Sequence, residues 1–431
     1  MRIVELTEST RKNVLNDLLK RSPNNYSEYE ETVNEILSNV KENGDQALFE
    51  YTLKFDKFQL TPENIRVTRE EIREAYAQMD SELVEVIKRS AANIHAFHEK
   101  QLRNSWFDAK EDGTILGMKI TPIGRVGVYV PGGKAAYPSS VLMNVIPAKV
   151  AGVTDIIMTT PPGADGKVNP GTLVAADIAG VGTIYKAGGA QAIAAMAYGT
   201  QSIPKVDKIT GPGNIFVALA KKAVYGYVSI DSIAGPSEIL VLADETANPR
   251  YVAADLLSQA EHDELASAIL ITTSRELAEQ VSEEVDGFVA RLSRREIMEK
   301  SLENYGYILL AEDMEAAIQA ANDIASEHLE ILTKNPFDTM TRIKNAGAIF
   351  LGEYSSEPLG DYYAGPNHIL PTNGTAKFFS PVNVDDFLKK TSIISYSREA
   401  LQAVHEDIER FAESEGLTAH ANSIRVRFEE Q

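Results

Sequence analysis

The stretch 258–263 carries two side chains whose types and spacing suit metal binding. Gln259 and His262 are three residues apart near the end of a predicted helix, 248–262, so they project from one helix face. An imidazole nitrogen beside an amide oxygen supplies part of a ligand set for a borderline cation such as Zn²⁺. A histidine at a helix end also stabilises the helix dipole, so the pair alone leaves both interpretations open.

Three other stretches concentrate polar residues, and a rival histidine pair competes with the first. Glu327 and His328 stand where a predicted helix gives way to an apolar run, and such a pair can share acid–base work by tuning each other's pKa. The segments 360–368 and 415–420 add further Asp, Glu and His residues. His95 and His98 are also three apart, but on a Lys- and Glu-rich helix, where surface histidines without a metal are common.

The composition excludes several classes of function. The chain of 431 residues is too long for one core, and its net charge of −20 argues against a nucleic-acid partner that needs a basic surface. The absence of cysteine excludes disulfides, Cys-ligated zinc, iron–sulfur clusters and thiol nucleophiles. No apolar run suits a signal peptide or a membrane span, so we expect a soluble cytoplasmic protein without a membrane partner.

The pattern of elements changes along the chain. Residues 1–105 have helical periodicity, whereas strands and helices alternate from residue 125 onward. The predicted strands are 115–121, 125–130, 155–160, 184–187, 206–210, 238–243, 268–272, 307–310 and 348–351. The predicted helices between them are 170–179, 191–198, 215–224, 248–262, 275–292 and 314–326, and a last helix spans 397–415. Such alternation predicts an α/β fold with parallel sheets, which bind ligands at the carboxyl ends of their strands.

Three strand-to-helix turns, 129–133, 187–191 and 210–214, are rich in glycine. Glycine lets the backbone approach a ligand, and the following helix offers free N–H groups to a phosphate. Neither the G-x-G-x-x-G fingerprint nor a Walker motif is present. The turns therefore suit either a nucleotide cofactor or simple tight turns of a parallel sheet.

Nine motifs, in order, give the chain a resemblance to the histidinol dehydrogenase family over nearly its full length. They are RVGVYVPGG at 125–133, YPSSVLM at 137–143, TGPGN at 210–214, AGPSE at 234–238, QAEHD at 259–263, EHLE at 327–330, GDY at 360–362, GPNHILPT at 365–372 and EGLTAH at 415–420. The resemblance implies a homodimeric enzyme that oxidises L-histidinol to L-histidine through the aldehyde, with two NAD⁺ and one Zn²⁺ per active site.

The resemblance also implies roles for particular residues. The metal ligands would be Gln259, His262, Asp361 and His420. The substrate would contact these four together with Ser237, His328, His368 and Glu415. The NAD⁺ contacts would be Tyr129, Gln191 and Asn214. Glu415 and His420 would serve the partner subunit's site, because the C-terminal tail of the family reaches across the dimer.

With the alternation of elements, the resemblance gives an expected domain plan and mechanism. We expect two Rossmann-like parallel-sheet domains, in tandem or interleaved, with a helical N-terminal and a small C-terminal appendage. Their expected limits are 1–25 for the N-terminal helical segment, 26–128 with 239–380 for the metal and acid–base domain, 129–238 for the NAD side and 381–431 for the tail. His328 would take the hydroxyl proton, Glu327 would activate water, and Zn²⁺ would position the substrate. Without cysteine, a thiohemiacetal route is impossible here.

Three other functions stay open from the sequence. A zinc hydrolase or deaminase would also use a metal and a Glu–His pair. A non-catalytic relative that binds ligand would lose one of the chemical residues, but all are present here. A dehydrogenase of another amino alcohol would keep the metal ligands and change the substrate side, where Ser237, His368 and Glu415 are kept.

Overall fold

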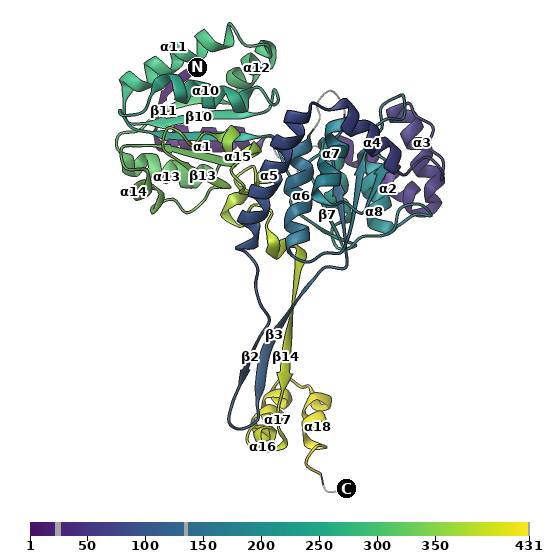
Figure 1. Cartoon of the computed structure of the whole chain (residues 1–431). Coiled ribbons are helices and arrows are strands. Elements are labelled where there is room, and N and C mark those ends of the chain that lie inside the picture. Colours follow the sequence, from purple (N-terminus) through teal and green to yellow (C-terminus); the bar gives the residue numbers. More distant parts are fainter. Residues whose placement is uncertain (22–26, 133–136, 430–431) are drawn as a thin grey trace. The chain divides into compact units, whose positions relative to one another are not determined.

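The fold is described from a computed structural model of the chain, which describes residues 1–21, 27–132 and 137–429. The expected boundary at residues 25 and 26 and the glycine at position 133 lie outside these described residues. The chain forms two compact units (Figure 1). Unit 1 comprises Met1–Gln101 and Ile123–Phe387, and unit 2 comprises Leu102–Pro122 and Leu388–Gln431.

A six-stranded sheet, entirely parallel, forms one half of unit 1, in the order β1-β11-β10-β9-β12-β13. Its strands are β1 (Arg2–Glu5), β9 (Glu238–Ala243), β10 (Ser267–Thr272), β11 (Gly306–Leu310), β12 (His328–Leu332) and β13 (Ala348–Leu351). The four central strands are buried along their whole length. Their continuous apolar runs are typical of parallel strands that helices cover on both faces.

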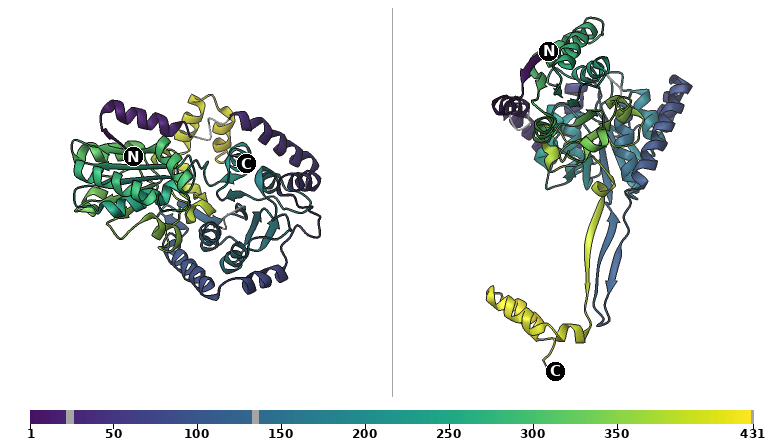
Figure 2. Two further views of the ribbon diagram at one scale, coloured as in Figure 1. Left: turned by 90° about the horizontal axis from the view of Figure 1, so that it is seen from above. Right: turned by 90° about the vertical axis from the view of Figure 1, so that its left-hand side faces the viewer.

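Helices cover both faces of this sheet (Figures 1 and 2). On one face lie α10 (Pro249–Ala260), α11 (Arg275–Val289) and α12 (Arg295–Tyr305), and on the other α1 (Glu8–Leu19), α13 (Met314–Ile324) and α14 (Pro336–Met340). Because side chains alternate along a strand, Val241 packs in the first layer and Leu242 in the second. This arrangement confirms the predicted α/β fold class.

A five-stranded parallel sheet forms the other half of unit 1, in the order β6-β5-β4-β7-β8. Its strands are β4 (Arg125–Tyr129), β5 (Asp155–Thr160), β6 (Thr183–Lys186), β7 (Lys208–Thr210) and β8 (Ser229–Ile230). The helices that connect them are α6 (Pro138–Val150), α7 (Pro170–Ala179), α8 (Gly189–Tyr198) and α9 (Ile215–Val224). The alanine-rich α8 is buried along nearly all of its length, so it needs a second layer of helices outside it.

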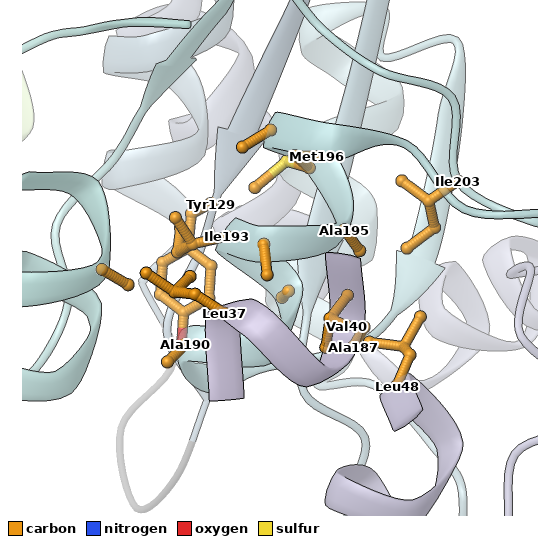
Figure 3. Packing of buried hydrophobic residues seen from close by; sticks show 14 of the residues in the cluster. Leu37, Val40, Leu48, Tyr129, Ala187, Ala190, Ile193, Ala195, Met196 and Ile203 are labelled. Atoms are coloured by element: carbon orange, nitrogen blue, oxygen red, sulfur yellow. The ribbon is translucent and has the colours of Figure 1, made fainter. Parts of the chain in front are cut away.

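That outer layer comes from the N-terminal part of the chain. It consists of α2 (Ser27–Asn43), α3 (Asp45–Asp56), α4 (Arg69–Gln78) and α5 (Ser81–Glu99). Figure 3 shows Leu37, Val40 and Leu48 packed against Ile193 and Ala195 of α8. The packing differs from the expected grouping of 26–128 with 239–380, because the apolar faces of these helices match the helices of the five-stranded sheet.

The first segment also differs from the helical expectation, because its first residues form β1 and pair with β11. Ile3 and Val4 are only half-buried at this edge, and so short a strand has no periodicity that the sequence could reveal. None of the helices in the described ranges combines the length and the apolar character that crossing a bilayer requires.

Unit 2 contains an antiparallel sheet, ordered β14-β3-β2, and three short helices. Its strands are β2 (Trp106–Ala109), β3 (Ile115–Pro122) and β14 (Leu388–Ser395), and its helices are α16 (Arg398–Gln402), α17 (His405–Ser414) and α18 (Thr418–Arg425). The predicted single helix 397–415 is therefore wrong, because Val404 leaves the helical conformation (φ −126°) between α16 and α17. The expected tail 381–431 begins at residue 388 as a compact unit and includes residues 102–122.

Candidate active site

The candidate site residues of unit 1 lie at the carboxyl ends of the strands in the five-stranded sheet but at the amino ends of the strands in the six-stranded sheet. The glycine turns follow β4, β6 and β7 at carboxyl ends, as expected. In the six-stranded sheet, however, Ser237 precedes β9, Glu327 precedes β12, and His328 opens β12, so these residues lie at amino ends. The expectation of carboxyl-end sites is therefore wrong for this sheet. The parallel register, with His328 beside Ile239, brings the starts of β12 and β9 together.

Glu327 is a buried carboxyl group held by the backbone of β9. Its Oε2 accepts the N–H of Glu238 at 2.9 Å. Burial raises the pKa of Glu327 well above its usual value, and the negative charges of Glu238, Asp361 and Glu357 add to that effect. A carboxyl group with a raised pKa binds its proton more tightly, so its ionised form is a stronger base than an ordinary carboxylate.

His328 is held by the same strand in one tautomer. Its Nδ1 lies 3.0 Å from the carbonyl oxygen of Glu238, and a carbonyl only accepts, so Nδ1 carries the proton. Nε2 is then unprotonated, and it is buried without a hydrogen-bond partner within the described part of the chain. Burial lowers the pKa of His328 to about 4, with further contributions from His262 and His368, so the ring is a neutral base at pH 7.

Two carboxyl groups from the short helix α15 (Glu357–Tyr362) face this imidazole. Oδ1 of Asp361 lies 3.9 Å from Nε2 of His328, and ligand atoms of His328, Glu357 and Asp361 lie within 4.8 Å of one another. Burial raises the pKa of Asp361 to about 6, and burial and the charge of Asp361 raise that of Glu357 to about 7. Sequence reasoning missed Glu357, although its spacing of four residues from Asp361 on one helix face was a usable signal.

Gln259 and His262 lie in different environments, although their spacing predicted that they project from one helix face. The helix α10 ends at Ala260, two residues before His262, so the pair does not share a helix face. Gln259 is 0% exposed, and neither its Oε1 nor its Nε2 has a hydrogen-bond partner among the described residues. His262 is exposed, and both residues border the same cavity. A buried amide with two unsatisfied atoms calls for a ligand.

A cavity of about 1420 Å³ connects the acid–base residues with the glycine turns. The predicted site residues that line it are Tyr129, Gln191, Asn214, Ser237, Gln259, His262, Glu327, His328, Asp361 and His368. Two predicted residues belong to unit 2: Glu415 is the C-cap of α17, and His420 lies in α18, both exposed. Unit 1 alone therefore collects ten of the twelve predicted residues in one cavity.

The glycine turns that border the cavity depend on close backbone packing. The buried hydroxyl of Tyr129 accepts the N–H of Gly189 at 3.1 Å, and burial raises the pKa of Tyr129 to about 12. Gly211 has φ +123°, and a Cβ there would lie 1.9 Å from the carbonyl oxygen of Tyr129, so only glycine fits. Gln191 is buried, and Asn214 caps α9 through the N–H of Val217.

The other histidines of unit 1 differ in burial and in hydrogen bonding. Nδ1 of His368 lies 3.2 Å from the carbonyl oxygen of Asp361, and burial lowers its pKa to about 4. His98 is buried and bonded to Gln101 at 2.8 Å, whereas His95 is exposed. These two side chains do not converge, so the rival metal pair finds no support, and the expectation of a solvated surface histidine is wrong for His98.

The cavity thus joins a neutral imidazole, a protonatable carboxyl group and a carboxylate cluster to turns that suit a nucleotide, as in an α/β enzyme with acid–base chemistry. Comparison with known proteins makes the class specific. The family model described as histidinol dehydrogenase matches residues 19–428. The chain is 57% identical to histidinol dehydrogenase from Clostridium acetobutylicum over 411 residues, covering 95% of each. It is 59% identical to that from Bacillus subtilis over 400 residues, covering 93% of each.

A solved structure agrees with these sequence relatives. The crystal structure of histidinol dehydrogenase from Elizabethkingia anophelis superposes with a TM-score of 0.93 at 40% identity, covering 99% of this chain and 98% of the other. The chain belongs to the histidinol dehydrogenase family, and it is an oxidoreductase.

Proposed function

We propose that this enzyme oxidises L-histidinol to L-histidine through L-histidinal in one site, with two NAD⁺. The observation that carries the proposal is the free Nε2 of His328, which is buried in a cavity that continues to the glycine turns. An unprotonated ring nitrogen there can take a hydroxyl proton from an alcohol, and the turns leave space for a dinucleotide beside it.

The residues of the cavity fit a bound zinc ion. Gln259 offers an unsatisfied buried amide oxygen, Asp361 offers a carboxylate, and His262 borders the same cavity. We assign these three residues as ligands, with His420 of the partner as the fourth. When bound, Zn²⁺ supplies fixed positions that orient the imidazole and amine of the substrate, and NAD⁺ supplies the hydride acceptor. Ser237 and His368 border the space where that substrate would lie.

The side chains of unit 1 divide the proton transfers between two steps. His328 takes the hydroxyl proton at Nε2 as the alcohol becomes an aldehyde, because burial keeps this ring neutral. Glu327 then takes a proton from the water that attacks the aldehyde carbon, because burial and the neighbouring negative charges raise its pKa and make its carboxylate a stronger base. The aldehyde hydrate is oxidised in turn, and holding the reactive aldehyde in one site between the two steps limits its loss to solvent.

The cofactor side uses Tyr129, Gln191 and Asn214, which border the cavity beside the starts of α8 and α9. Both helices have ten residues, and their first N–H groups suit a pyrophosphate. Tyr129 supports the turn before α8 through the N–H of Gly189. The cofactor therefore approaches from the five-stranded sheet and the substrate from the six-stranded one.

We further propose a homodimer in which Glu415 and His420 complete the partner's site. Both side chains are exposed on unit 2, and the cavity of unit 1 contains a cluster with unsatisfied polar atoms. A symmetric exchange of the two small units would supply the missing groups twice. We place this biosynthetic reaction in the cytoplasm.

The test is to mix purified protein with L-histidinol and NAD⁺ and to measure NADH and histidine. Two NADH per histidine, lost on chelation and restored by Zn²⁺, is the expected result. Turnover of another amino alcohol in preference to histidinol would contradict the substrate assignment. Hydrolysis without NADH would favour a zinc hydrolase, and binding without turnover would contradict an active enzyme.

A further inference from the structure

Arg21 is a buried cation that the proposed reaction steps do not use. It follows α1 and is 1% exposed in unit 1. Its Nη2 donates to Oε1 of Glu238 at 2.6 Å, and its Nη1 donates to the carbonyl oxygen of Leu265 at 2.7 Å. The guanidinium also lies 5.1 Å from the ring centre of Tyr305. One side chain thus connects the first strand residue of β9 with the loop between α10 and β10.

Glu238 is the residue on which both acid–base groups rest. Its N–H donates to Glu327, and its carbonyl oxygen accepts from His328. Its own carboxylate also accepts a hydrogen bond, because its Oε2 lies 3.4 Å from the backbone nitrogen of Glu327. Each of the two buried glutamates therefore accepts the backbone N–H of the other. A displacement of Glu238 would therefore weaken the hydrogen bonds that hold Glu327 and the Nδ1–H form of His328.

The charges explain why this frame needs an arginine. Glu238 and Glu327 are two buried glutamates whose carboxyl groups each accept the backbone N–H of the other, and an unpaired buried anion costs far more than a paired one. Arg21 is the cation that contacts Glu238. Its planar fork also reaches Leu265 in the same geometry, which a lysine cannot do with one ammonium group.

We propose that Arg21 is a positioning residue for the proposed oxidation: with Glu238 it forms a counter-charged frame that holds Glu327 and the Nδ1–H form of His328. This inference rests on the proposed function. Arg21 acts through Glu238 and transfers no proton itself. The frame supports the rate of the chemical steps. Substrate binding and zinc binding depend on other residues.

The test compares Arg21→Met, Arg21→Lys, Glu238→Gln and the double variant Arg21→Met/Glu238→Gln. For the zinc-loaded Arg21→Met enzyme we expect kcat to fall by roughly 100-fold with KM for histidinol within about threefold, because the loss concerns orientation of the catalytic groups. The double variant removes both charges, so it should recover at least about tenfold in kcat over Arg21→Met. Arg21→Lys keeps the charge and one hydrogen bond and should lose roughly tenfold.

The matched control is Lys208→Met, which removes another buried cation. Lys208 is the first residue of β7, pairs with Asp386 at 3.0 Å and is not among the residues that border the cavity. The Lys208→Met substitution should lower the melting temperature while kcat stays within about twofold of the wild-type value. The inference is overturned if Arg21→Met keeps its kcat to the same extent, or if the double variant is no better than Arg21→Met.

Two measurements separate this inference from the proposed function. The wild-type enzyme is assayed first, and a failure to form NADH from histidinol would contradict the function itself. If the wild type is active and Arg21→Met does not fold, Arg21→Lys decides, because an unchanged kcat in that variant overturns the frame. Zinc content of each variant shows that a lost rate does not come from lost metal.

Discussion

Glu327 and His328 are neighbours in the chain, yet they do not form a hydrogen-bonded pair: Oε2 of Glu327 lies 3.7 Å from Nδ1 of His328. Both groups bond instead to the backbone of Glu238, one to its N–H and the other to its carbonyl oxygen. The sequence predicted a pair in which each group shifts the pKa of the other. The two groups are thus held by different backbone atoms of one residue, Glu238, and their pKa values shift in opposite directions, which suits two separate proton transfers.

The separation predicts that substitutions at the two positions affect different steps. Glu327→Gln should slow histidinal oxidation by roughly 100- to 10,000-fold and the first oxidation much less, because only the second step needs activated water. His328→Asn should slow the first oxidation by a similar factor. The measurement is single-turnover NADH formation from histidinol and from histidinal. His95→Asn, at an exposed histidine, serves as the control. Equal losses in both steps for Glu327→Gln would contradict its role.

The proposed exchange of unit 2 predicts complementation between inactive variants. His420→Asn should lower zinc content and activity while unit 1 keeps its far-ultraviolet circular dichroism, because His420 lies in unit 2. Mixed with Glu327→Gln and allowed to exchange subunits, it should regain about a quarter of wild-type activity, since half of the dimers are mixed and each has one intact site. Glu415→Gln should complement in the same way. No recovery after verified exchange would show that the tail serves its own subunit.

The sequence predicted those parts of the fold that depend on local patterns. The strands 155–160 and 238–243 and the helices 170–179 and 215–224 match the structure, because apolar runs and capping residues fix them locally. The strand β1 was missed because its partner β11 lies about three hundred residues away, and nothing in Arg2–Glu5 announces that pairing. The break between α16 and α17 has no proline or glycine to signal it.

The site shows the same difference between features that local sequence predicts and features that depend on distant contacts. Motif resemblance predicted ten residues that the cavity collects, but not how they are held. The burial of His98 was missed because one of its contacts, Asn367, is 269 positions away. Arg21 and Glu238 were missed because a charged residue at the end of a helix or strand normally indicates a surface, and only the packed structure shows their pairing.

Asp56 predicts a pH dependence of stability away from the proposed metal ligands. Burial raises its pKa from 3.8 to about 6, so the folded chain holds this proton more tightly than the unfolded chain. The stabilising effect of protonation is complete below pH 4 and is lost as pH rises through 6. Asp56→Asn should therefore be more stable than the wild type by about 1 to 2 kcal/mol at pH 8, allowing for partial exposure, and nearly equal at pH 4. Urea unfolding of the two proteins at both pH values measures this difference, and a constant difference would contradict the shifted pKa.

Gln259 predicts a conflict between stability and metal binding. Neither polar atom of its buried amide has a hydrogen-bond partner in the part of the chain that the structure describes, so the metal-free protein bears the cost of burying them. Gln259→Leu has a similar volume and no polar atoms. It should stabilise the metal-free protein by about 1 to 2 kcal/mol while it abolishes stoichiometric zinc binding and activity. The measurement compares urea unfolding of the variant with that of the chelated wild type, with zinc content determined in parallel. A variant less stable than the chelated wild type would show that the amide is satisfied without metal, and full zinc content would remove Gln259 from the ligand set.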